Sequence, residues 1–225
     1  MRKLSLPVLV LVLIPLSGCR DVQVRDEPPP PVGGGAATCG DIDTSGTELV
    51  SNSDFDRALE DWERFEVGAA GFNNVTHDSR TTCGKAAVFT REGSEGGTGH
   101  IALLQPLEIE VDEFSRLRLQ MLFRIDAQEL TSDGFLGGET PVFVTTNYED
   151  EAGILKSWIR GFLVTGSQIN YPDRDQVIPP SAWFQYTEDN ILPEIPDAAR
   201  ITRIVAGGNG QDFHSSISLV SLRGE

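Results

Sequence analysis

The stretch "SRLRLQMLFRID", residues 115–126, decides the fold class of this protein. Its apolar residues recur at every second position, with charged and amide residues between them. That period places the two sets on opposite faces of a β-strand. The apolar set is Leu117, Leu119, Met121, Phe123 and Ile125, and the polar set is Arg116, Arg118, Gln120 and Arg124. We therefore expect a long strand that is buried on one face.

Further strand signals occur on both sides of this stretch, separated by clusters of Gly, Asp, Asn and Pro. They cover residues 86–92, 100–111, 141–148, 153–164, 182–188, 200–207 and 215–222. The one helical candidate, residues 54–64, is short. Eight or more strands without intervening helices predict an all-β fold, an antiparallel β-sandwich of jelly-roll type. Residues 39–225 have a suitable length for one such domain.

The N-terminus has the features of a secretion signal. Arg2 and Lys3 precede an apolar run from Leu4 to Leu16, which is shorter than the roughly 20 residues that span a bilayer. The following junction, Leu16 to Cys19, closely resembles the lipobox of bacterial lipoproteins. This resemblance implies that residues 1–18 are a lipoprotein signal peptide. It also implies that Cys19 is acylated and becomes the mature N-terminus.

Residues 19–38 contain charged residues, four consecutive prolines and three consecutive glycines. Such a segment has too little apolar surface to offset the entropy of ordering, so we expect a disordered linker that separates the domain from the lipid anchor. The expected location is the bacterial cell envelope, with membrane contact through the lipid only. Some bacteria retain lipoproteins at the inner membrane through an Asp directly after the acylated cysteine. This chain has Arg20 at that position, which favours a location at the outer membrane or cell surface.

Charge and cysteine content limit the partners and predict a crosslink. The formal net charge is −16, and a field of that sign repels phosphate backbones, so nucleic acid is not an expected partner. Once Cys19 carries lipid, Cys39 and Cys83 remain as a pair in an oxidising compartment. A disulfide between them is favoured, with two free thiols as the alternative.

Several short motifs resemble the galactose-binding-like jelly rolls, which include many bacterial carbohydrate-binding modules. They are "ELVSNSDFD" (48–56) followed by Trp62, "CGKAAVFTRE" (83–92), and "ARITRIVAGGNGQDFHSSISLVSL" (199–222). The middle of the chain is also similar to a group of exported bacterial proteins. The resemblance to the jelly rolls implies the fold more directly than the function.

Domains of this kind often hold a structural Ca²⁺ ion, and the resemblance makes that ion the one candidate cofactor. Asp56 matches the position of the first carboxylate ligand, but Ser218 stands where the last carboxylate would be. Losing a charged ligand weakens a calcium site. A retained site, with Asp56 as its metal residue, is the less favoured alternative.

No nucleophile motif, metalloprotease motif or phosphate-binding loop occurs in the sequence, so we expect no catalytic residues and no enzyme activity. Binding residues are easier to propose. If Leu155, Ile159 and Leu163 face the core, then Trp158 and Arg160 lie on an exposed sheet face, where sugars could stack and form hydrogen bonds. Trp183 and Tyr171 could extend this strip. The alternative is that Trp158 is buried.

The sequence thus predicts an envelope lipoprotein that displays a non-catalytic, carbohydrate-binding-like domain. Its partner is then a glycan, bound by Trp158, Arg160, Trp183 and Tyr171. Two alternatives remain, a structural or adaptor module that contacts another envelope protein and, less favoured, a glycan hydrolase. A hydrolase needs two carboxylates at a defined separation.

Overall fold

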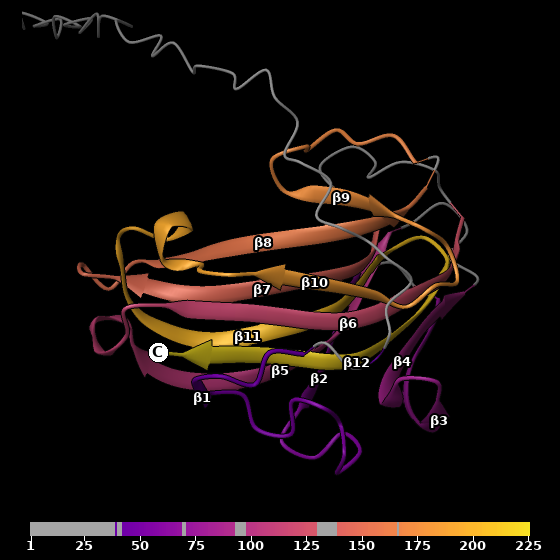
Figure 1. The fold of residues 1–225 in the computed structure, drawn as a ribbon. Coiled ribbons are helices and arrows are strands. Elements are labelled where there is room, and N and C mark those ends of the chain that lie inside the picture. The colour runs from indigo at the N-terminus through magenta and orange to yellow at the C-terminus, as the bar shows by residue number, and fades with distance from the viewer. Residues whose placement is uncertain (1–38, 40–41, 69–70, 93–97, 130–138, 166) are drawn as a thin grey trace, which may run out of the picture. The chain divides into compact units, whose positions relative to one another are not determined.

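The computed structural model describes residues 39, 42–68, 71–92, 98–129, 139–165 and 167–225. The predicted signal peptide, acylated Cys19 and linker all lie outside these described residues. Within them, the chain forms two β-sheets and two short 3₁₀ helices, η1 (Val111–Glu113) and η2 (Leu192–Glu194) (Figure 1). The described part contains no helix with the length and apolar character needed to cross a membrane.

The first sheet, named here the β6 sheet, has six strands. Its main path runs in the order β10 (Phe184–Glu188), β6 (Leu117–Gln128), β12 (Phe213–Gly224), β4 (Gly84–Glu92) and β3 (Phe72–Thr81), and β1 (Thr47–Glu48) pairs with β12. Every pairing in this sheet is antiparallel.

The second sheet, named the β7 sheet, also has six strands. Their order is β2 (Glu63–Gly68), β5 (Gly99–Glu110), β11 (Ala198–Gly210), β7 (Thr140–Asp150), β8 (Leu155–Val164) and β9 (Asp175–Ile178). All pairings are antiparallel except β8 with β9, which is parallel. The consecutive strands β11 and β12 lie inside opposite sheets, so the prediction of a jelly-roll β-sandwich is confirmed.

The core lies between the sheets, and β6 contributes to it as its sequence predicts. Its five alternating apolar side chains are fully buried and belong to one hydrophobic cluster. Aromatic rings from both sheets meet there: Phe123 of β6 lies 4.5 Å from Phe162 of β8 and 5.6 Å from Phe184 of β10, measured between ring centroids. The contact between Phe123 and Phe162 joins the two sheets.

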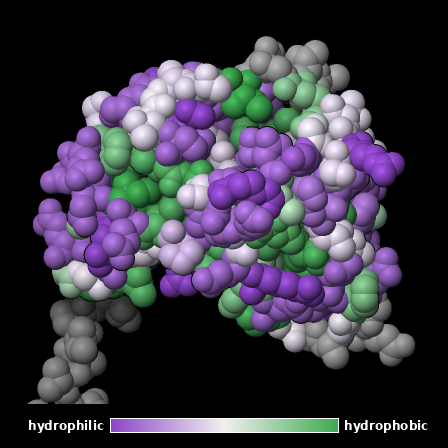
Figure 2. All heavy atoms as spheres, turned by 90° about the horizontal axis from the view of Figure 1, so that it is seen from below, coloured by the Kyte–Doolittle hydropathy of each residue, from purple (hydrophilic) through white to green (hydrophobic). Residues whose placement is uncertain are grey.

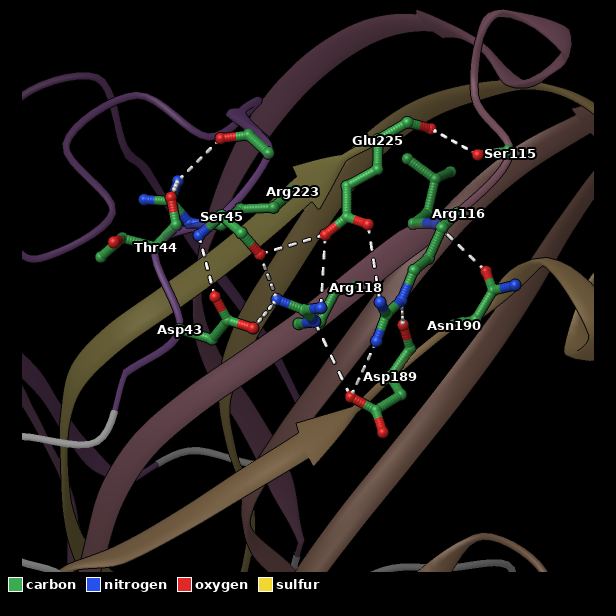
Figure 3. Close-up of polar contacts among 12 residues, drawn as sticks. Asp43, Thr44, Ser45, Ser115, Arg116, Arg118, Asp189, Asn190, Arg223 and Glu225 are labelled. Atoms are coloured by element: carbon green, nitrogen blue, oxygen red, sulfur yellow. Dashed lines mark hydrogen bonds and ion pairs between the residues drawn. The ribbon is translucent and has the colours of Figure 1, made fainter.

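Part of the outer face of the β6 sheet is covered by the N-terminal segment 42–46, just before β1. Arg118, on the predicted polar face of β6, is only 4% exposed because Asp43, Ser45 and Glu225 surround its guanidinium (Figure 3). The predicted disulfide joins Cys39 to Cys83, with Cα atoms 5.1 Å apart. It fixes the start of the segment to the turn between β3 and β4.

The helical candidate at residues 54–64 is a series of turns instead, followed by the start of β2. Phe55, Ala58 and Asp61 all have positive φ, and a non-glycine residue with that backbone conformation interrupts a right-handed helix. The turns are held by side chains: Asn52 donates from Nδ2 to the carbonyls of Ala58 (3.0 Å) and Glu60 (2.8 Å).

Candidate functional site

Trp158 and Arg160 do not form the exposed strip that the sequence predicted. The strand β8 has the opposite orientation, so that Trp158 faces the other sheet and is 6% exposed, whereas Leu155 is 59% exposed. Arg160 covers the indole at 4.6 Å and donates a hydrogen bond to the Tyr186 hydroxyl (3.2 Å). The prediction of an exposed strip is wrong, because both faces of β8 carry apolar residues.

Trp183 and Tyr171 lie apart from Trp158. Trp183 is 9% exposed and belongs to a small apolar cluster, against which Ile42 and Cys83 also pack. Its ring lies 5.3 Å from the Arg124 guanidinium. Tyr171 stacks on Arg174 at 4.4 Å, just before β9. The four predicted ligand residues are therefore not brought together.

The region around Asp56 does not fit a calcium ion. The Lys85 ammonium donates to the Asp56 backbone carbonyl at 2.6 Å and lies 3.2 Å from its carboxylate. Ser218 Oγ is directed to the Leu122 carbonyl at 3.5 Å. Among the described residues, no three His, Cys, Asp or Glu side chains are grouped closely enough to hold a metal. A lysine thus already satisfies the oxygen atoms that a cation would need.

A groove lies on the outer face of the β7 sheet and has a volume of about 300 Å³. The strand register explains its shape, because residues directly opposite each other in neighbouring strands share a face. One row crosses the whole sheet with one residue from each strand: Phe65, Ala102, Gly207, Phe143, Gly161 and Asp175. Half of this row is Gly or Ala: Gly161 lines the groove, whereas Ala102 and Gly207 are buried beneath it.

Two aromatic rings stand in that row. Phe65 of β2 is 44% exposed, and Phe143 of β7 is partly buried. Three strand spacings separate them, which corresponds to about 14 Å. Gly207 lies between them, where a Cβ atom would approach the Ile101 carbonyl oxygen to 2.3 Å. The close approach of β5 and β11 therefore requires glycine at position 207.

The neighbouring row gives the groove a mixed lining. It contains Val205, Thr145 and Ile159, which lie opposite one another on β11, β7 and β8. Asn209 of β11 and His100 of β5 also lie opposite each other, and they add polar groups to the groove lining. The groove thus combines apolar surface with hydroxyl, amide and imidazole groups.

One end of the groove carries a guanidinium in a fixed position. Arg174 donates from Nε and Nη2 to the two carboxylate oxygens of Asp175, at 2.9 and 3.0 Å, and its guanidinium lies over the Tyr171 ring. The Asp175 side chain is fully buried and the Arg174 side chain is 28% exposed. Arg174 is therefore the member of this ion pair that the groove presents.

His100 contributes an uncharged imidazole at neutral pH. Desolvation, and then the positive charge of Arg91, lower the pKa of His100 below its ordinary value of 6.5. The ring lies edge-on to Phe143, with centroids 6.0 Å apart. Near pH 7, the Arg174–Asp175 pair is therefore the charged feature of the described groove lining.

Glu139 was not singled out by its sequence, and it is fully buried beside the groove residue Thr140. Its Oε1 accepts a hydrogen bond from the Gln211 backbone N–H (2.5 Å), and its Oε2 has no hydrogen-bond partner among the described residues. Burial, together with the negative charges of Glu129 and Asp212, raises the pKa of Glu139 to about 7. The carboxyl is thus largely neutral below pH 7.

No protein-family model and no curated protein sequence matches this chain. Solved structures of similar fold include the carbohydrate-binding module TmCBM61 in complex with β-1,4-galactotriose (13% identity, 80% of this chain and 99% of that chain, TM-score 0.44). Another is the family 11 carbohydrate-binding module of the cellulase Lic26A-Cel5E of Clostridium thermocellum (10%, 81% and 97%, 0.45).

A third is a Bacteroides thetaiotaomicron protein described as sugar-binding (12% identity, 80% of this chain and 100% of that chain, TM-score 0.47). At these identities and TM-scores the matches carry no argument about this chain, and what those proteins bind belongs to them. The two sheets and the groove define this chain as a jelly-roll β-sandwich with an open, ligand-sized depression on one sheet face.

Proposed function

We propose that this protein binds carbohydrate in the groove of the β7 sheet, without catalysing a reaction. The observation that carries the proposal is that two aromatic residues of one row, Phe65 and Phe143, line the groove together with polar side chains. The C–H faces of sugars pack on aromatic rings, and their hydroxyl groups pair with hydroxyl, amide and guanidinium groups. A volume of about 300 Å³ is sufficient for a small ligand.

The position of the rings favours an extended ligand over a single sugar. Rings about 14 Å apart across the sheet can both be contacted only by several linked sugar units. Part of the outer face of the β6 sheet is already covered by the segment 42–46, which favours the β7 sheet as the binding face. The face of the molecule seen in Figure 2 is mixed, with apolar patches between hydrophilic side chains.

The experiment is a glycan array followed by calorimetry on three variants. Phe143→Ala and Phe65→Ala remove the two rings, and Phe72→Ala removes a 60% exposed ring outside the groove. We expect the first two to weaken binding at least about tenfold, since stacked aromatic groups are frequent hot spots. Phe72→Ala should bind as wild type does. Equal binding by all variants, or none by wild type, would reject the proposal.

The proposal of binding without catalysis rests on the carboxylates. Asp175 is the one carboxylate among the described residues that line the groove, and Arg174 already neutralises it. Glycoside hydrolysis generally uses two carboxyl groups flanking the scissile bond. The alternative of an adaptor module would be favoured if cross-linking in cells captured one envelope protein and the array gave no signal.

We also propose that the domain is displayed on a lipid anchor at the cell envelope. The support is the lipobox-like sequence at residues 16–19. Labelling with an alkyne fatty acid tests it, because wild type should incorporate the label and Cys19→Ser should not. Equal labelling of both proteins would contradict acylation at Cys19.

A further inference from the structure

The ion pair at the end of the groove has a consequence for the class of glycan. A guanidinium at a binding surface ordinarily favours acidic ligands, because it pairs bidentately with carboxylate and phosphate groups. Arg174 already uses Nε and Nη2 in that geometry, on the buried carboxylate of Asp175. Its positive charge is therefore cancelled at a distance of 2.9 Å.

We infer that the Arg174–Asp175 pair restricts the groove to uncharged glycans and excludes those that carry uronate or sulfate groups. This inference rests on the proposed carbohydrate binding and specifies its ligand. Arg174 then acts as a fixed hydrogen-bond donor for sugar hydroxyls, without the net attraction for anions that a lone guanidinium would have. Asp175, which is buried behind it, is the specificity-determining residue.

Two further features of the charge distribution agree with this. The whole chain carries a formal net charge of −16, so the long-range field opposes the approach of a polyanion. His100 is held neutral, so it supplies no second cation to the groove at pH 7. Among the described lining residues, only these three are ionisable.

The geometry also explains why Arg174 is fixed. The centroid of the Tyr171 ring lies 4.4 Å from the Arg174 guanidinium, and the ring adds a cation–π contact. The Asp175 carboxylate lies over Gly161, where a Cβ atom would come within 2.4 Å of Oδ1. Glycine at this position therefore allows the carboxylate to lie against β8 and pair with Arg174.

The test compares a neutral hexose polymer, chosen from the wild-type array result, with the same polymer after oxidation of its primary hydroxyls to carboxylates. Wild type should prefer the neutral form. Asp175→Asn keeps the size of the side chain and leaves the Arg174 charge uncompensated. For Asp175→Asn, we expect the affinity for the neutral polymer divided by the affinity for the oxidised polymer to fall about tenfold. The reason is that a ligand carboxylate would gain one partly buried charge pair with Arg174.

Two further variants keep the test decisive. Asp173→Asn makes the same change in net charge on an exposed neighbouring residue and should leave the ratio unchanged. Arg174→Gln combined with Asp175→Asn removes both charges and should restore the preference for the neutral form. Thermal melts show whether each variant is folded.

The outcomes separate the two proposals. If wild type binds glycans but Asp175→Asn and Asp173→Asn give the same ratio, the charge-cancellation inference is wrong and carbohydrate binding stands. A wild-type preference for the oxidised polymer would likewise overturn the inference alone. If wild type binds neither polymer nor any glycan on the array, both proposals fail.

Discussion

The buried carboxyl of Glu139 makes the stability of the domain depend on pH. Its pKa is raised from 4.5 to about 7, with desolvation as the largest cause. Below the unfolded-state pKa, the carboxyl is protonated in both states and imposes no penalty. Between that value and pH 7, the unfolded chain loses the proton more readily, so the free energy of unfolding falls. Above pH 7 the full penalty of about 3 kcal/mol applies.

Urea denaturation at pH 4 and pH 8 measures this effect. Wild type should be less stable at pH 8, and Glu139→Gln should gain about 3 kcal/mol over wild type there, while the difference should be much smaller near pH 4. Glutamine is neutral at every pH and can still accept the hydrogen bond from the Gln211 N–H. The neighbouring charges of Glu129, Asp212 and Arg91 remain in both proteins.

Glu151→Gln is the matched control, because Glu151 is exposed and is not among the charges that shift the pKa of Glu139, so its removal should change the free energy of unfolding little at either pH. The reasoning would be refuted if Glu139→Gln and wild type differed equally at pH 4 and pH 8. It would also be refuted if Glu139→Gln were the less stable protein at pH 8.

Three other predictions follow from the described contacts. Trp158→Ala should lower the free energy of unfolding by about 3 to 5 kcal/mol, as for a buried Trp in a core, and a loss under 1 kcal/mol would contradict its placement between the sheets. Replacing Cys39 and Cys83 by Ser should cost about 3 to 4 kcal/mol, because the bridge closes a long loop; unchanged urea midpoints would contradict it. Because Lys85 satisfies the Asp56 oxygens, neither EDTA nor millimolar Ca²⁺ should shift the melting temperature, and a calcium-dependent increase would show a site after all.

The sequence predicted those strands in which one face is clearly polar. In β6, arginine and glutamine alternate with apolar residues, so only one orientation buries the apolar set and leaves charge outside. Arg118 nevertheless became buried, since Asp43 and Ser45 come from a segment more than seventy residues away. Alternation reveals which residues share a face, but it does not reveal what covers that face.

The groove could not be predicted for a similar reason. Its row takes one residue from each of six strands, and Ala102, Gly207 and Gly161 are far apart in sequence. Each of them is an ordinary small residue within its own strand. The signal that could have been used is the adjacent pair Arg174 and Asp175 after Tyr171, but only the parallel pairing of β8 with β9 places that pair on a groove.

By itself, the sequence determined the all-β class, the jelly-roll sandwich, most of the long strands and the cysteine pair, because these depend on local periodicity and composition; it did not predict β3. The tertiary structure decided which face of β8 is buried. Leu155 and Ile159 on one face and Trp158 and Phe162 on the other are both apolar, so burial of either set is favourable in isolation. Packing against Phe123 and Tyr186 of the opposite sheet selects the aromatic face, and the remaining face is then free to line the groove.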